Sequence, residues 1–92
     1  MQPTSKQRAE LKARAHDLTP VVHIGKYGLT PEALANIDKA LNDHQLSKIK
    51  YLNHKEQRHQ LSEEIASTTR STLVDVIGNI AILYREKRET SE

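Results

Sequence analysis

Hydrophobic residues recur at helical spacing in three segments of this chain, which span residues 5–18, 31–43 and 55–69. Ser5 or Thr4 can cap the first of these helices. The third segment has the narrowest apolar face. The residues expected to point inward are Leu11, Ala15 and Leu18 in the first segment, Ala33, Leu34, Ile37, Ala40 and Leu41 in the second, and Leu61, Ile65 and Thr68 in the third.

Four further segments are short and rich in β-branched residues, which is typical of strands. Gly78 and Asn79 separate the last two, and a two-residue connection of this composition is suited to a tight β-hairpin. The four predicted strands span residues 21–24, 46–52, 72–77 and 80–85.

The predicted elements follow the order α-β-α-β-α-β-β. Helices between strands require crossover connections, so the sequence predicts an α/β fold, a small two-layer sandwich with a mixed four-stranded sheet covered by helices. A chain of 92 residues has room for one such domain, which we assign to residues 1–85. Residues 86–92 contain several charges and no apolar residue, which is typical of a C-terminal tail.

One connection has an unusual composition, because the first predicted strand ends at the loop Gly25-Lys26-Tyr27-Gly28 and a helix follows directly. Two glycines allow positive φ angles and close approach of a ligand to the backbone. Thr30 is placed as an N-cap and Pro31 as the first helical residue, so the free amides of that helix face the loop. The pattern indicates an anion site, although glycines at a strand-to-helix turn also have a purely structural explanation.

Cationic residues are concentrated in the half of the chain that contains this loop. Residues 1–50 carry eight Lys or Arg against five Asp or Glu, whereas residues 51–92 carry six against seven. A net charge of +2 is too small to identify a nucleic-acid protein unaided, and solvated surfaces explain such groups equally well. The candidates are Arg8, Lys12 and His16 on one stripe of the first helix, and Lys48 and Lys50 on one face of the second strand.

The sequence shows no pattern typical of an enzyme or a metal site. The absence of cysteine excludes disulfides and thiolate zinc sites. His54 and His59 point in different directions on a helix, so we assign them structural or surface roles. The glycine loop lacks the Walker and dinucleotide spacings, and no nucleophile has an adjacent base. We therefore expect no catalytic residues, no metal, no cofactor and no small-molecule substrate.

Apolar runs are too short to cross a membrane, and the longest is Ile80–Tyr84. The N-terminus lacks the basic and then apolar pattern of a signal peptide. We therefore expect a cytoplasmic monomer without membrane contact.

Five separated segments carry motifs that occur together, in this order, in one known family. They are residues 11–16, 20–30, 37–41, 76–78 and 83–85. Together they resemble the CRM domain, named for chloroplast RNA splicing and ribosome maturation, and in particular its stand-alone YhbY-type members. The resemblance covers roughly residues 5–85. It implies a fold similar to the C-terminal domain of translation initiation factor three, with a Gly-x-x-Gly loop like that of KH domains.

This resemblance implies an RNA-binding protein that associates with ribosomal RNA of the large-subunit precursor and assists ribosome assembly. Two departures from the family are Asn79, where many members have a basic residue, and Gln45, where Glu is usual. A protein-interaction module with a purely structural loop remains the alternative. The RNA-binding residues implied by the resemblance are Gly25, Lys26, Tyr27 and Gly28 in the loop, and Arg8, Lys12, Arg14 and His16 in the first helix.

Overall fold

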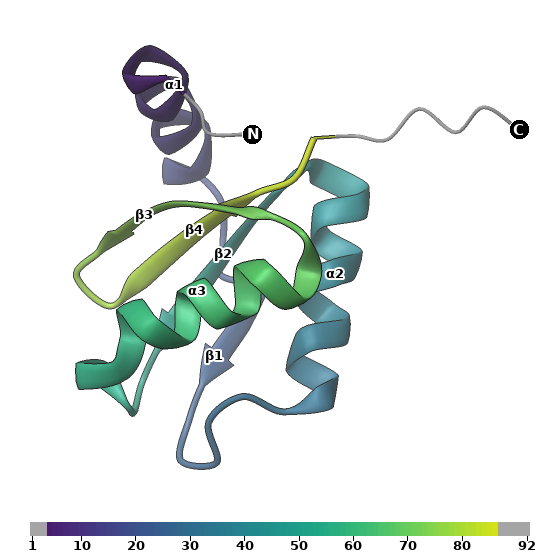
Figure 1. The fold of residues 1–92 in the computed structure, drawn as a ribbon, viewed down its shortest axis with the longest axis vertical. Coiled ribbons are helices and arrows are strands. Elements are labelled where there is room, and N and C mark those ends of the chain that lie inside the picture. The colour runs from purple at the N-terminus through teal and green to yellow at the C-terminus, as the bar shows by residue number, and fades with distance from the viewer. Residues whose placement is uncertain (1–3, 87–92) are drawn as a thin grey trace, which may run out of the picture.

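The computed structural model describes residues 4–86, and their elements follow the predicted order α-β-α-β-α-β-β (Figure 1). Of the predicted tail, only Glu86 lies within the described residues. The helices are α1 (Ser5–His16), α2 (Pro31–His44) and α3 (Arg58–Thr69), with the short 3-10 helix η1 (Lys55–Gln57) before α3, and the strands are β1 (Val22–Ile24), β2 (Leu46–Tyr51), β3 (Thr72–Ile77) and β4 (Ile80–Tyr84).

The strands form one mixed sheet in the order β1-β2-β4-β3. β1 and β2 are parallel neighbours, and α2 is the crossover connection between them. The other two pairs, β2 with β4 and β4 with β3, are antiparallel. The predicted hairpin between β3 and β4 is confirmed, since Ile77 pairs with Ile80. Gly78 takes a φ of 58°, a left-handed value that glycine adopts without strain.

Helices cover both faces of this sheet. α2 and α3 pack on one face, over a core that includes Ile24, Ile49 and Leu83. α1 packs on the opposite face, where Leu11 and Ala15 contact a second core made with the outward residues of β2, β3 and β4. The α/β class and the mixed sheet are therefore as predicted, but α1 adds a partial third layer to the predicted two-layer sandwich (Figure 1).

A β-bulge explains how α1 is attached to its face of the sheet. Leu73 pairs with Leu83 and Asp75 pairs with Ile82, so Val74 is an extra residue in β3. Because of this insertion, the buried Val74 packs against α1 while the adjacent Asp75 also reaches that helix, through Lys12. A regular strand would have turned one of these two neighbours to the other face.

The buried stripe of α3 differs from the prediction by one position. Thr68 was predicted to point inward and is exposed, whereas Thr69 is buried. Ser62 is also buried. Its hydroxyl is satisfied there, since it donates to the Arg58 carbonyl and accepts from the Tyr51 hydroxyl. Similarly, Thr69 Oγ1 donates to the Ile65 carbonyl. Polar residues that satisfy their own hydrogen bonds can occupy the core side of a helix, which hydrophobic periodicity does not detect.

The first and third predicted helices also end or begin differently. α1 ends at His16, so Leu18 lies beyond it, although its side chain still packs on the α1 core. Residues 55–57 were predicted as the first turn of the third helix and form η1 instead. Among the described residues, no helix is both long and apolar enough to cross a membrane.

Candidate functional site

The loop Gly25–Gly28 is a tight turn that projects from the end of β1 (Figure 1). The Gly28 amide donates to the Gly25 carbonyl at 3.0 Å, and Gly28 has a φ of 72°. Tyr27 is 84% exposed, and Lys26 Nζ lies 5.7 Å from the centre of its ring, within range of a cation–π attraction. The tip of the loop therefore presents a cation and an aromatic ring together.

Three backbone amides of the loop are available to a ligand. The Gly28 amide is used by the turn itself, whereas those of Gly25, Lys26 and Tyr27 have no hydrogen-bond acceptor within residues 4–86. Exposed backbone donors next to a lysine are suited to a phosphate group. These three amides are the backbone donors that the predicted anion site could use.

α2, the helix that follows the loop, has fewer groups free to bind an anion than the sequence predicts. Thr30 is its N-cap, but Thr30 Oγ1 accepts from the Ala33 amide at 3.1 Å and so occupies that donor. Pro31 has no amide hydrogen, and Glu32 places a carboxylate in the first turn. A negative side chain at this position already neutralises the helix dipole, so α2 contributes little to anion binding.

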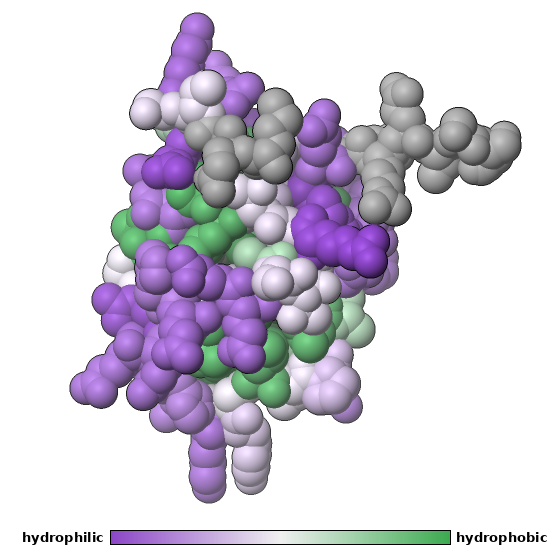
Figure 2. All heavy atoms as spheres, in the orientation of Figure 1, coloured by the Kyte–Doolittle hydropathy of each residue, from purple (hydrophilic) through white to green (hydrophobic). Residues whose placement is uncertain are grey.

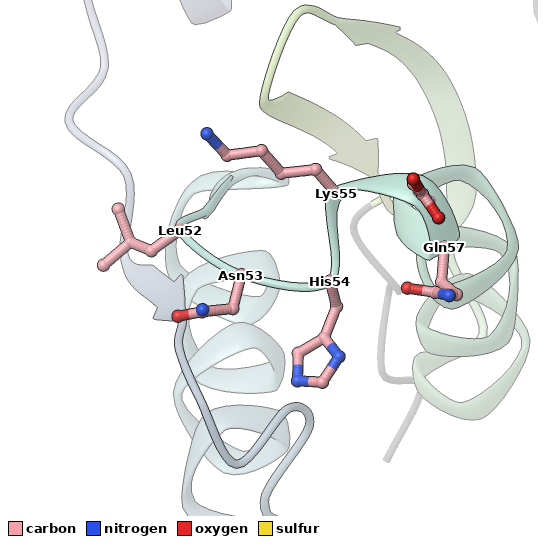
Figure 3. A pocket seen from close by; sticks show the side chains of 6 residues that line it. Leu52, Asn53, His54, Lys55 and Gln57 are labelled. Carbon is pink, nitrogen blue, oxygen red and sulfur yellow. The ribbon is translucent and has the colours of Figure 1, made fainter.

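Sequence reasoning missed a second segment, residues 52–57, that lies against the loop. The amides of Leu52 and Asn53 both donate to the carbonyl of Ile24, at the base of the loop. His54 Nε2 lies 3.0 Å from the Lys26 carbonyl oxygen. Figure 3 shows the imidazole extending from this segment towards the loop, beside a shallow hollow that residues 52–57 line. No spacing in the sequence indicates this contact, because it joins residues 28 positions apart.

Lys50 lies beside the loop, on the face of the sheet that also carries α1. It pairs in register with His23, two residues before Gly25, and with Ile80 in β4. Both Lys50 and His23 are exposed, and no acidic side chain of the described residues pairs with Lys50. The structure therefore brings Lys50 together with the predicted loop.

Lys48 shares that face but is already occupied. Its ammonium group donates to the carbonyls of Ala15 at 3.0 Å and Leu18 at 3.1 Å, and lies 3.4 Å from that of His16. These carbonyls end α1, where a cation also interacts favourably with the helix dipole. Lys48 thus caps α1, and the predicted equivalence of Lys48 and Lys50 is not observed.

The basic residues of α1 lie away from the loop. α1 packs over the end of the sheet where Leu46 and Tyr84 pair, whereas the loop follows the other end (Figure 1). Lys12 is bound to Asp75, with Nζ 3.0 Å from Oδ2. The remaining predicted residues of this helix, which are exposed, are Arg8, Arg14 and His16.

The Asp75 carboxyl is affected by its contact with α1. Partial burial acts to raise its pKa, but hydrogen bonds from Lys12 and the Val76 amide, together with the charge of Arg8, outweigh this effect. The pKa of Asp75 is therefore below its ordinary value. The ammonium group of Lys12 thus has a partner within the protein, as that of Lys48 does.

No cluster of three or more metal-ligating side chains occurs among residues 4–86. In the space-filling view, hydrophobic residues form separate green areas, and the lower end, which the loop occupies in Figure 1, is hydrophilic or intermediate in hydropathy (Figure 2). The site is thus a polar projection with a small hollow beside it.

Comparison with known proteins identifies the class to which this fold and loop belong. The family model for the CRS1 / YhbY (CRM) domain matches residues 4–85. The chain therefore belongs to the CRM domain family, and the predicted family is confirmed.

Individual relatives support this assignment over most of their length. A Pseudomonas aeruginosa protein named as a probable RNA-binding protein is 39% identical over 84 residues, which are 90% of this chain and 81% of that protein. The probable RNA-binding protein YqeI of Bacillus subtilis is 36% identical over 90 residues, or 97% of this chain and 94% of YqeI. A Staphylococcus aureus protein solved in solution superposes with a TM-score of 0.80 at 35% identity, covering 98% of this chain and 95% of that one.

Proposed function

We propose that this protein binds RNA through the Gly25–Gly28 loop and assists assembly of the large ribosomal subunit in the cytoplasm. RNA binding is supported by membership of the CRM family and by the names of the bacterial relatives. The more specific partner, ribosomal RNA of the large-subunit precursor, follows from the family resemblance of the loop and the other motifs. Family and relatives alike favour binding over catalysis.

The observation that carries the proposal is the exposed tip of the loop. Lys26 has no acidic partner among the described residues, Tyr27 is 84% exposed, and the amides of both are free of intramolecular acceptors. Exposing an aromatic ring and backbone donors has no benefit for folding. The same groups are suited to a nucleic acid, whose phosphates accept hydrogen bonds and whose bases stack on aromatic rings.

The proposed mechanism is electrostatic and geometric. The Lys26 and Tyr27 amides and the Lys26 ammonium bind phosphate oxygens, while the Tyr27 ring stacks on an unpaired base or contacts a ribose. Lys50 extends this contact along the sheet. At the far end of that face, Arg8, Arg14 and His16 provide further phosphate contacts, whereas Lys12 and Lys48 are excluded because their ammonium groups already bind protein atoms. Phosphate contacts carry little sequence information, so RNA shape provides most of the selectivity.

The direct test is the double variant Lys26→Glu with Gly28→Asp, assayed against transcribed fragments of large-subunit ribosomal RNA. We expect affinity to fall at least tenfold, because the variant places two negative charges where phosphate binds. Lys39→Glu is the control for the lysine, since it makes the same charge change as Lys26→Glu but on α2, outside the proposed contact surface. Circular dichroism and thermal unfolding verify that each variant is folded.

Two results would contradict the proposal. One is wild-type RNA affinity in the folded double variant, and the other is an affinity that does not change with salt concentration. Co-purification of a protein partner that survives ribonuclease treatment would instead favour the protein-interaction module.

A further inference from the structure

His54 is the side chain that connects the second segment to the loop. Its Nε2 atom lies 3.0 Å from the Lys26 carbonyl oxygen. A carbonyl oxygen only accepts hydrogen bonds, so Nε2 carries the hydrogen and the imidazole donates. A β-carbon built on Gly28 would lie 3.7 Å from the same Nε2, so the ring lies on the open side of the second glycine. His54 therefore contacts the loop at the Lys26 carbonyl and faces Gly28.

This bond fixes the orientation of one peptide group. The Lys26 carbonyl and the Tyr27 amide belong to the same peptide, whose carbonyl and amide hydrogen point in opposite directions because the bond is planar and trans. When His54 holds the carbonyl on its own side, the Tyr27 amide must point away from His54. That amide is one of the three loop donors without an acceptor among the described residues.

The segment that carries His54 is itself firmly placed. Its preceding residues, Leu52 and Asn53, donate to Ile24 at 2.8 Å and 3.1 Å, and its own carbonyl accepts from Gln57. His54 has a φ of 58°, in the left-handed region, where a residue with a β-carbon costs about 1 kcal/mol or more. Asn adopts the left-handed region more readily than Gln does.

We propose that His54 is a positioning residue for phosphate binding, which orients the Lys26–Tyr27 peptide so that the Tyr27 amide faces the RNA backbone. This inference rests on the proposed function of the loop. The ligand class is a phosphodiester, and His54 acts on it through the loop without touching it. Loss of the bond lets the peptide rotate, and the free amide then has to be ordered when RNA binds.

Two substitutions separate the bond from the backbone conformation. In His54→Gln the side-chain amide nitrogen occupies roughly the place of Nε2 and can still donate to Lys26, whereas in His54→Asn the shorter side chain cannot reach. Asn is nevertheless the better residue for the left-handed backbone. A backbone role therefore predicts that the Asn variant performs best, and a positioning role predicts that the Gln variant does.

We expect His54→Asn to lower the affinity for large-subunit ribosomal RNA fragments about three- to tenfold, and His54→Gln to retain most of it. His59→Gln is the matched control, because it removes an exposed imidazole from α3 that is paired only with Glu63. Wild-type affinity in folded His54→Asn would overturn the inference, provided that Lys26→Glu with Gly28→Asp still loses binding. Wild-type affinity in that double variant would instead refute the proposed function.

A second measurement tests the positioning role without RNA. Inorganic phosphate is titrated into ¹⁵N-labelled protein while the amide proton shift of Tyr27 is recorded. We expect this proton to move downfield in the wild type and in His54→Gln, and to respond weakly in His54→Asn, at unchanged thermal stability. An equal response in all three proteins would overturn the inference even if their RNA affinities differed.

Discussion

Basic side chains lie at both ends of the sheet, but they serve different purposes. At the end where Leu46 pairs with Tyr84, Arg85 donates to Asp38 Oδ1 and to the Thr69 carbonyl at 2.7 Å each, and also to Asn42 Oδ1 at 2.8 Å. At the other end, the side chains of Lys26, Lys50 and Lys55 have no acidic partner within residues 4–86. Arg85 thus holds the fold together, whereas the lysines around the loop are free to bind a ligand.

The difference shows that charge alone does not define a binding surface. Arg85 joins β4 to α2 and α3, and its side chain is only 20% exposed. Its geometry uses the planar fork of the guanidinium, which bonds several acceptors at once. A lysine ammonium with no acceptor in the protein is instead available to phosphate. The number of internal acceptors therefore separates structural cations from candidate RNA contacts.

The largest expected effect is that of Arg85→Ala at the structural end. Loss of bonds to three residues should lower the free energy of unfolding by about 2–3 kcal/mol, measured by urea denaturation. RNA affinity at a temperature where the variant is folded should change less than twofold. A large loss of affinity at wild-type stability would assign Arg85 to the RNA site and abolish the distinction between the two ends. Arg85→Lys should recover only part of the stability, because it lacks the fork.

Next in size is Lys48→Met, which keeps the length of the side chain but removes its ammonium group. The carbonyls of Ala15 and Leu18 lose their donor, so the free energy of unfolding should fall by about 1–2 kcal/mol. Thermal unfolding measures this loss, and the salt dependence of RNA affinity should match that of the wild type. A reduced salt dependence at unchanged stability would place Lys48 among the phosphate contacts.

Lys50→Met is the partner experiment on the same strand, with a smaller effect on stability. Lys50 is exposed and has no acidic partner within residues 4–86, so its removal should change the free energy of unfolding by less than about 0.5 kcal/mol. Affinity should fall a few fold, and the slope of log K against log salt should decrease in magnitude by about 0.7–0.9. If Lys50→Met and Lys48→Met behave alike in both assays, the structural distinction between these two lysines is wrong.

The smallest effect concerns the pH dependence of the Lys12–Asp75 pair. The pKa of Asp75 is lowered in the folded protein, so the pair stabilises the fold above the ordinary aspartate value of 3.8. This contribution is lost as the pH falls through the lower pKa of the folded state. Both side chains are partly exposed, at 40% and 36%, which limits the contribution to about 0.5 kcal/mol. In Asp75→Asn the free energy of unfolding should therefore decrease less than in the wild type as the pH is lowered. An equal decrease in both proteins would contradict the pairing.

Much of the fold could be predicted because local pattern and tertiary structure agree there. The stripe through Ile37 and Leu41 in α2 and the Gly78-Asn79 hairpin required only the spacing of apolar residues and turn chemistry. The loop was likewise predictable, because its two glycines lie only three positions apart in the sequence. Prediction failed where a contact between residues far apart in the sequence determines the local structure or the role of a side chain.

Three particular residues illustrate this limit. The bulge at Val74 attaches α1 to the second face of the sheet, and no feature of the sequence around Val74 indicates an extra residue. Lys48 has the same sequence pattern as Lys50, but the end of α1 lies over only one of them. His54 reaches Lys26 because β2 runs parallel to β1 and ends beside it. In each case the partner is distant in sequence, so local patterns carry no information about it.

The central claim is that the Gly25–Gly28 loop is the main RNA contact and that Arg85 serves the fold and does not contact RNA. The most direct measurement is a chemical-shift titration of ¹⁵N-labelled protein with a fragment of large-subunit ribosomal RNA. We predict the largest changes at Lys26 and Tyr27, smaller ones at Lys50 and His54, and none at the Arg85 side chain. Large changes at Arg85, with Lys26 and Tyr27 unaffected, would contradict the claim.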